Sequence, residues 1–259
     1  MNIDIVNDPD ELRNVLPIVQ SAWGMQNADQ LVKDTLTAMK FHGGVVLMAK
    51  ENGKVIGINF SFPGFKNGQV YLYSHMTGVL EERKYNGTGF KLKKAQEEWA
   101  RSNGYRLIVW TFDPLMSLNA NFNIHKIGAI SRKYLHNFYG NMEDSLNFGL
   151  PTDRFIAERW LFVDPIRTRI PDHIIDPISI DPLKLSISDD IVGVRIPSNF
   201  VEMKKNSRDT SALFRKNSAL IFESLFDLGF IVVDFDREKA YYTLSREKSV
   251  TEKLPAKIF

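Results

Sequence analysis

The spacing of hydrophobic residues separates the first part of the chain into helices and strands. Apolar side chains recur three and four positions apart, the period of an amphipathic helix, at residues 9–23, 28–41, 88–102 and 113–127. They alternate or form short unbroken runs, as in strands, at residues 3–6, 45–50, 54–62, 70–79, 105–112, 129–139 and 154–164. The sequence therefore predicts the order β-α-α-β-β-β-α-β-α-β-β up to residue 164.

Turn signals support this order at two places. Asn52-Gly53 favours a tight hairpin, which makes the strands around it and the strand that follows an antiparallel meander. Asp113-Pro114 combines a helix cap with a proline at the first helical position. We therefore expect a helix to begin there and to end at Gly128.

The pattern changes after residue 164. Residues 165–190 are rich in proline and have no helical period, so we interpret them as a connection. Residues 191–259 predict a strand, an amphipathic helix that ends at Gly229, and a hairpin. We therefore expect an α+β protein with a main domain of residues 1–164, a connection of 165–190 and an extension of 191–259.

Composition narrows the class of protein. Of the 259 residues, 44% are hydrophobic and 25% are charged, which is ordinary for a globular protein. The net charge of +2 is too small to indicate nucleic acid, and the basic patches "KLKK", "SRKY" and "MKKNSR" are separated and lack interleaved aromatic residues. There is no cysteine, which excludes disulfides, thiolate catalysis and zinc–thiolate sites.

Membrane and export signals are missing from the sequence. No apolar run approaches the roughly 18 residues of a membrane span, and the N-terminus has no apolar signal segment. We expect a cytoplasmic protein that binds neither nucleic acid nor membrane.

The segment "KYNGTGF" lies between a strand and a helix and is typical of an anion site. The first N–H groups of a helix lack internal partners and carry partial positive charge, and glycines let an anion approach them. The lysine–serine/threonine pair of a P-loop is missing after Gly89. The third glycine of a dinucleotide motif is also missing, because Leu92 stands there, and the preceding strand belongs to an antiparallel meander.

Residues 84–89, Lys-Tyr-Asn-Gly-Thr-Gly, resemble the motif Q/R-x-x-G-x-G/A of the GCN5-related N-acetyltransferases (GNATs). The order of elements in residues 1–164 also resembles that family. The resemblance implies α/β/α layers with a central mixed, splayed sheet of about seven strands, followed here by an α/β extension. Lys84 departs from the motif, since it keeps the charge of arginine but loses the planar fork.

The resemblance implies that acetyl-CoA or another acyl-CoA binds as the acyl donor, without a metal. The pyrophosphate would lie on the N–H groups of residues 85–90, and the pantetheine arm would follow the strand end before them. An asparagine near the start of the next helix would bond the pantetheine or the acceptor side, with exposed polar residues of a helix as the alternative, and we expect the two asparagines that are four apart to share a face. The implied residues are Val79, Leu80, Lys84, Tyr85, Asn86, Gly87, Thr88, Gly89, Phe90, Asn119 and Asn123.

Transfer of an acyl group to an amine needs a proton acceptor and a polarised carbonyl. In GNATs the carbonyl is held by backbone N–H groups of the fourth strand, here around Leu80. His75 lies on that strand, on one face with Tyr73, Thr77 and Val79 by the two-residue period, and its ordinary pKa suits a base. The alternative is a packed, hydrogen-bonded strand histidine.

Other catalytic assignments stay open. Glu82 is a second candidate for the base, although its charged segment also suits a solvated loop. The tyrosine that is the usual GNAT acid lies four residues before the helix-ending glycine, where this chain has Ile124. The donors left are His125, Tyr134 and Tyr139, and water or no acid at all is equally compatible.

The long segment between the last two strands of the main domain is typical of a functional loop. It carries Tyr139, Asp153 and Arg154, where Arg154 could hold a carboxylate and Asp153 an ammonium group, with a surface salt bridge as the alternative. The segments "SHMTGV", "TFDPL" and "GLPTDRF" resemble a branch of predicted acyltransferases for small acceptors, such as amino acids.

We therefore predict an acyl-CoA-dependent N-acyltransferase that acts on a small amine by direct transfer, without a covalent enzyme intermediate. The alternative is a non-catalytic CoA-binding module whose extension mediates dimerisation or binds a partner. A homodimer is left open.

Overall fold

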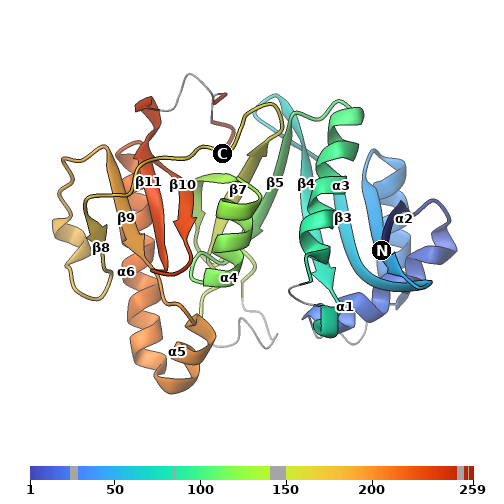
Figure 1. Ribbon diagram of the computed structural model, residues 1–259, viewed down its shortest axis with the longest axis horizontal. Coiled ribbons are helices and arrows are strands. Elements are labelled where there is room, and N and C mark those ends of the chain that lie inside the picture. Colours follow the sequence, from blue (N-terminus) through green and yellow to red (C-terminus); the bar gives the residue numbers. More distant parts are fainter. Residues whose placement is uncertain (24–28, 84–85, 141–149, 250–253, 256) are drawn as a thin grey trace. The chain divides into compact units, whose positions relative to one another are not determined.

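The computed structural model describes residues 1–23, 29–83, 86–140, 150–249, 254–255 and 257–259. Contacts group the chain into two compact units, Met1–Trp110 and Thr111–Phe259 (Figure 1). Residues 111–164 therefore pack with the C-terminal part of the chain, which differs from the division at residue 164. It stays a prediction that residues 1–164 form the acyltransferase domain, residues 165–190 a connection and residues 191–259 an extension.

The first unit follows the predicted order. It consists of β1 (Asn2–Ile5), a 3-10 helix (Pro9–Val15), α1 (Leu16–Trp23), α2 (Asp29–Phe41), β2 (Val45–Glu51), β3 (Lys54–Lys66), β4 (Gln69–Val79), a 3-10 helix (Glu81–Arg83), α3 (Thr88–Ser102) and most of β5 (Leu107–Phe112). Strands β1 to β4 form the expected antiparallel meander.

Strand β5 joins this sheet in parallel, and only near one end of β4. The pairs between the two strands are Leu72↔Ile108 and Tyr73↔Val109, although β4 continues to Val79. The described parts of the two strands therefore separate after Tyr73. This agrees with the expected mixed and splayed sheet.

The two faces of the sheet in the first unit carry separate apolar clusters. One face packs against the N-terminal helices, and its cluster includes Leu12, Ile18, Leu36, Met48, Ile58 and Phe60. The other face packs against α3, and its cluster includes Val45, Leu47, Ile56, Val79, Leu92 and Trp99. Because both faces of the sheet are covered, β2 has no polar side in the sequence.

The second unit contains the predicted strand, helix and hairpin of the extension. It consists of α4 (Ser117–Ala120), a π-helix (Asn121–Lys126), β6 (Ile130–Leu135), β7 (Arg154–Trp160), β8 (Ile174–Ile175), a 3-10 helix (Pro182–Lys184), β9 (Ile191–Arg195), α5 (Phe200–Asn206), α6 (Arg208–Asp227), β10 (Phe230–Asp236), β11 (Tyr241–Arg246) and a 3-10 helix (Glu247–Ser249). Its strand order is β7-β6-β10-β11-β9-β8.

The extension continues the sheet of its unit. Strand β10 pairs with β6 through Val232↔Ser131, so the hairpin of β10 and β11 covers an edge of β6. No helix in the described ranges combines the length and hydrophobicity that a membrane crossing needs.

The helix expected from Pro114 begins later than predicted and changes its type. The Asp113 side chain accepts a hydrogen bond from the Leu115 N–H at 2.9 Å, which closes a turn in front of α4. The α-helix then lasts four residues. The Ile127 N–H donates to the Phe122 carbonyl at 2.9 Å, the i→i+5 bond of a π-helix.

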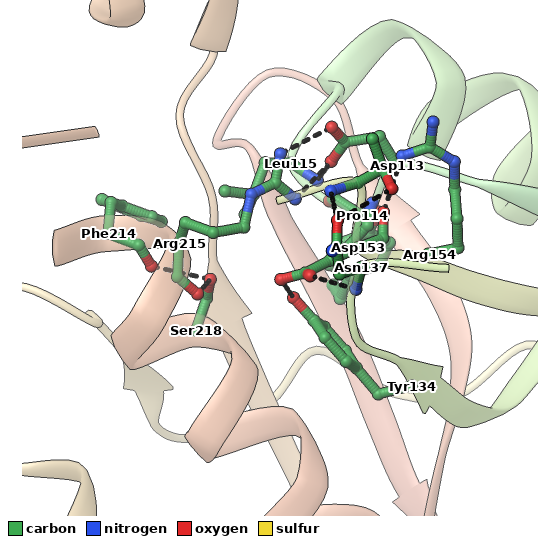
Figure 2. A network of polar contacts seen from close by, with 12 residues as sticks. Asp113, Pro114, Leu115, Tyr134, Asn137, Asp153, Arg154, Phe214, Arg215 and Ser218 are labelled. Carbon is green, nitrogen blue, oxygen red and sulfur yellow. Dashed lines mark hydrogen bonds and ion pairs between the residues drawn. The ribbon is translucent and has the colours of Figure 1, made fainter. Parts of the chain in front are cut away.

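A buried ion pair explains why Asp113 forms this turn. Arg215 of α6 donates to both carboxylate oxygens of Asp113, at 2.8 and 2.6 Å, and the two side chains are 5% and 12% exposed (Figure 2). Burial by itself opposes the ionisation of Asp113, but the charge and hydrogen bonds of Arg215 lower its pKa overall. The extension therefore neutralises a carboxylate that directly follows β5.

Replacing Arg215 by methionine should lower the free energy of unfolding by about 3–5 kcal/mol, because Asp113 keeps a buried charge without its partner. The measurement is urea unfolding near neutral pH. Lys216→Met, at the exposed neighbouring position, should change stability by about 0.5 kcal/mol or less. Equal losses in the two variants would contradict a special role for the pair.

Candidate functional site

Strand β4 contains a β-bulge at His75. The register pairs Phe60 with Met76 and Ser61 with Ser74, so His75 is the extra residue and has no partner across the strands. The expectation that His75, Thr77 and Val79 share a face is therefore wrong. An extra residue shifts the two-residue alternation, and the side chains on either side of it exchange faces.

His75 lies among aromatic rings on the face of the N-terminal helices. Its ring centroid is 6.0, 5.9 and 6.2 Å from those of Phe60, Phe62 and Tyr73, although the residue as a whole is exposed. Desolvation by these neighbours lowers the pKa of His75. The imidazole is therefore neutral and able to accept a proton near neutral pH, which suits a base and equally suits a packed strand histidine.

The end of β4 differs from the expectation in one respect. Val79 and Leu80 are half-buried, but the Leu80 N–H donates to the Ile56 carbonyl at 3.0 Å. This N–H group is occupied by β3, which argues against its use in holding a carbonyl. The bulge at His75 is the place where the hydrogen-bond ladder of β4 is interrupted. Glu82 lies beyond the strand and is exposed.

The start of α3 is open to solvent. Gly87 is the N-cap residue, with a left-handed φ of 77°, and a Cβ atom added to it would meet nothing within 4 Å. Its carbonyl accepts the Lys91 N–H at 3.0 Å, so the helix begins there. Among the described residues, no side chain therefore crowds the position of a Cβ atom at Gly87.

The other predicted residues of this segment differ in exposure. Asn86 and Phe90 are exposed and Gly89 is half-buried. Thr88 is buried, with its hydroxyl 3.6 Å from the Met1 sulfur. Lys84 and Tyr85, which carry the departure from the motif, lie outside the described residues.

A closed ring of buried hydrogen bonds lies between α3 and the bulge. Lys93 Nζ donates to Ser74 Oγ at 2.9 Å and to Gln96 Oε1 at 3.1 Å. Gln96 donates to Ser61, Ser61 donates to Asn59 Oδ1 at 3.1 Å, and Asn59 Nδ2 donates to Ser74 at 3.3 Å. All five side chains are at most 4% exposed. Sequence reasoning missed this ring.

Lys93 is a buried amine beside an aromatic ring. Its Nζ atom lies 3.8 Å from the Trp110 ring centroid, a cation–π geometry. Burial lowers the pKa of Lys93 to about 7, against the opposing charge of Glu97. The apolar period gives no signal for it, because Lys93 lies about 100° around the helix from Leu92, outside the stripe of Leu92, Ala95 and Trp99.

The acceptor-side candidates lie in the second unit and take different roles. Asp153 accepts from the Tyr134 hydroxyl at 2.7 Å and from the Asn137 N–H at 2.9 Å, which argues against an ammonium site there (Figure 2). Arg154 is buried and lies 5.2 Å from the Tyr139 ring. Tyr139 is 41% exposed and therefore remains accessible to a ligand.

The other proton donors are mostly engaged. Ile124 is fully buried. His125 Nδ1 lies 2.8 Å from Asp234 Oδ1, beside a cavity of about 280 Å³ in the second unit. Burial, with the nearby charge of Asp153, raises the pKa of Tyr134, whose hydroxyl is already committed to that carboxylate.

The expectation that Asn119 and Asn123 share a helix face is also wrong. Asn119 is exposed, whereas Asn123 is 6% exposed. The helix changes from α to π between them, so residues four apart no longer stack above one another.

Solved structures of acetyltransferases share the fold of this chain. A GNAT-family protein from Desulfovibrio desulfuricans has a TM-score of 0.50 and 16% identity, and the match covers 62% of this chain and 98% of that one. An aminoglycoside 6'-acetyltransferase type Ii has a TM-score of 0.50, 15% identity and coverage of 64% and 100%. A Salmonella typhimurium structure with its cofactor acetyl-CoA has a TM-score of 0.51, 18% identity and coverage of 62% and 93%.

No protein-family model matches the sequence, and no curated protein does either. The structural matches show that this chain has the GNAT fold, which confirms the predicted α+β fold class. Almost the whole of each known structure is matched, while more than a third of this chain has no counterpart in it.

The buried amine predicts a pH dependence of stability. An unfolded lysine holds its proton up to a pH of about 10.4, whereas folded Lys93 releases it near pH 7. Between these values the unfolded state binds more protons, so the free energy of unfolding should rise with pH, by up to about 1.4 kcal/mol per unit. Lys93→Met should flatten this rise in urea unfolding, while Lys94→Met should keep it. An unchanged slope in Lys93→Met would contradict the assignment.

Proposed function

We propose that the protein is an acyl-CoA-dependent N-acyltransferase, which moves an acetyl or larger acyl group to the amine of a small molecule such as an amino acid. The observation that carries this proposal is the open, left-handed Gly87 at the start of α3, the helix that follows β4 in a GNAT fold. The structure from Salmonella typhimurium, which contains acetyl-CoA, supports the same choice of donor.

The donor's pyrophosphate would rest on the backbone N–H groups at the start of α3. These groups have no partners in the preceding turn of the helix, and Gly87 and Gly89 leave the approach clear. Val79 and Leu80 would border the pantetheine arm. The donor contacts of four further residues stay predictions from the resemblance: Lys84, Tyr85, Asn119 and Asn123.

The bound donor supplies a thioester, whose acyl carbon the amine attacks, so that a C–N bond forms and the C–S bond breaks. His75 accepts the amine proton, because its lowered pKa keeps it neutral. The interrupted ladder at the bulge is the proposed source of the N–H group that polarises the carbonyl. The leaving thiolate takes a proton from water or from Tyr139. No covalent bond to the protein is needed.

Tyr139 and Arg154 are the proposed acceptor-side residues. Tyr139 is accessible, and its hydroxyl lies 3.0 Å from that of Thr111. Arg154 lies beneath the ring and contributes positive charge that suits an acceptor with a carboxylate, such as an amino acid.

A CoA-binding module without turnover is the second candidate. The buried Ile124, at the position of the usual acid, favours it. In that case the extension would serve dimerisation or a partner. Release of free thiol from acyl-CoA in the presence of a panel of amines separates the two candidates, and the cysteine-free chain adds no background.

A carboxylate at position 87 should abolish binding of CoA. Asparagine and aspartate both tolerate a left-handed backbone, so Gly87→Asp and Gly87→Asn differ in charge rather than in strain. Gly87→Asp should lose the thermal stabilisation by CoA and acetyl-CoA, whereas Gly87→Asn should keep part of it.

Gly53→Asp is a matched control, since Gly53 is left-handed and its added Cβ also meets nothing within 4 Å. Equal CoA stabilisation of Gly87→Asp and Gly53→Asp would reject the proposed loop.

Removal of the imidazole should slow the transfer. His75→Ala should lower kcat in the thiol-release assay by about a hundredfold. CoA stabilisation should persist, because His75 is not among the residues proposed to hold the donor. Glu82→Ala, at an exposed position, is the comparison. Wild-type turnover of His75→Ala at saturating acceptor would remove His75 as the base.

A further inference from the structure

We infer that Lys93 is a positioning residue, which acts through Ser74 to hold the β4 bulge in the shape that presents His75. This inference rests on the proposed function for its role in acyl transfer. The contact between Lys93 and the bulge is a property of the first unit alone.

The ring of hydrogen bonds holds β4 on both sides of the extra residue. Ser74 directly precedes His75 and receives hydrogen bonds from Lys93 and Asn59. The same Asn59 amide donates to Thr77 at 2.8 Å, beyond the bulge. One asparagine therefore spans the bulge, and Lys93 ties this span to α3.

The ring also fixes the partner strand. Ser61 is the register partner of Ser74, and it lies in the ring between Asn59 and Gln96. The register shift occurs between Phe60 and Ser61, so the ring covers the point on β3 that faces the bulge. Three elements, β3, β4 and α3, are thus joined at the register shift between β3 and β4.

Burying the lysine side chain at position 93 costs folding free energy. Burying it opposes folding, and an apolar side chain would pack beside Leu92 and Trp110 without that cost. The amine offers donors directed at Ser74 and Gln96 together, which a methionine lacks. The cost is therefore explained by the geometry that these two hydrogen bonds impose.

The coupling from Lys93 to His75 runs through the backbone rather than through charge. Ser74, Asn59 and Ser61 are uncharged, as is Trp110 of β5, and Glu97 on the same helix is the charged group that acts on the amine. The His75 ring contacts Phe60, Phe62 and Tyr73. Lys93 instead contacts the side chain of Ser74, the residue before His75.

The experiment compares Lys93→Met and Ser74→Ala with the wild-type protein and with Lys94→Met. Lys94 is the neighbouring residue and pairs with Glu97 at 2.9 Å. The readouts are the NMR signals of the His75 ring with their pH titration, thermal stabilisation by CoA, and kcat for thiol release. The chain has 5 histidines, and the His75 signal is identified by its absence from His75→Ala.

Lys93→Met and Ser74→Ala should both shift the His75 signal and lower kcat by about tenfold or more, because small displacements of reacting groups are costly. Both should keep CoA stabilisation, and Lys94→Met should match the wild type. Ser74→Ala removes the contact while leaving the amine in place, so it carries the test if Lys93→Met does not fold.

Unchanged His75 signals in both variants would overturn the inference. A loss of CoA stabilisation parallel to the loss of kcat would also overturn it, because Lys93 would then act on the start of α3. If the wild-type protein releases no thiol with any amine, the proposed function fails. The His75 signals then decide whether Lys93 holds the bulge.

Discussion

One extra residue in β4 determines which side chains of the first unit face one another. Because His75 has no partner in β3, the alternation shifts, and Ser74 and Thr77 both reach Asn59 on the side of α3. The imidazole is left among aromatic rings on the opposite side. A regular strand cannot make both arrangements at once, so the buried ring and the neutral histidine depend on the same irregularity.

The second unit depends on a different constraint, the buried charge of Asp113. This residue follows β5 directly, and its carboxylate both turns the chain toward α4 and requires a cation in a place closed to water. The extension supplies that cation from α6. The extension therefore lies in the same compact unit as β6 and β7.

Prediction from sequence succeeded where local pattern decides the structure. The meander, the hairpin at Asn52-Gly53 and the helix ending at Gly229 follow from periodicity and turn residues. The bulge at His75 could not be predicted, because alternation does not mark where an extra residue interrupts it. Arg215 lies 102 positions from Asp113, so no local signal links the pair. Lys93 could not be predicted either, because it lies about 100° around the helix from Leu92, outside the stripe of Leu92, Ala95 and Trp99, where a lysine reads as exposed.

More than a third of this chain has no counterpart in the known structures that it resembles. Matches that cover 93% or more of three known chains use at most 64% of this one. In the second unit, β10 pairs with an edge of β6 that would otherwise expose unpaired backbone groups, and Arg215 neutralises a carboxylate that would otherwise be buried alone. The extension therefore supplies partners both to the edge of β6 and to Asp113, and it lies in one compact unit with them.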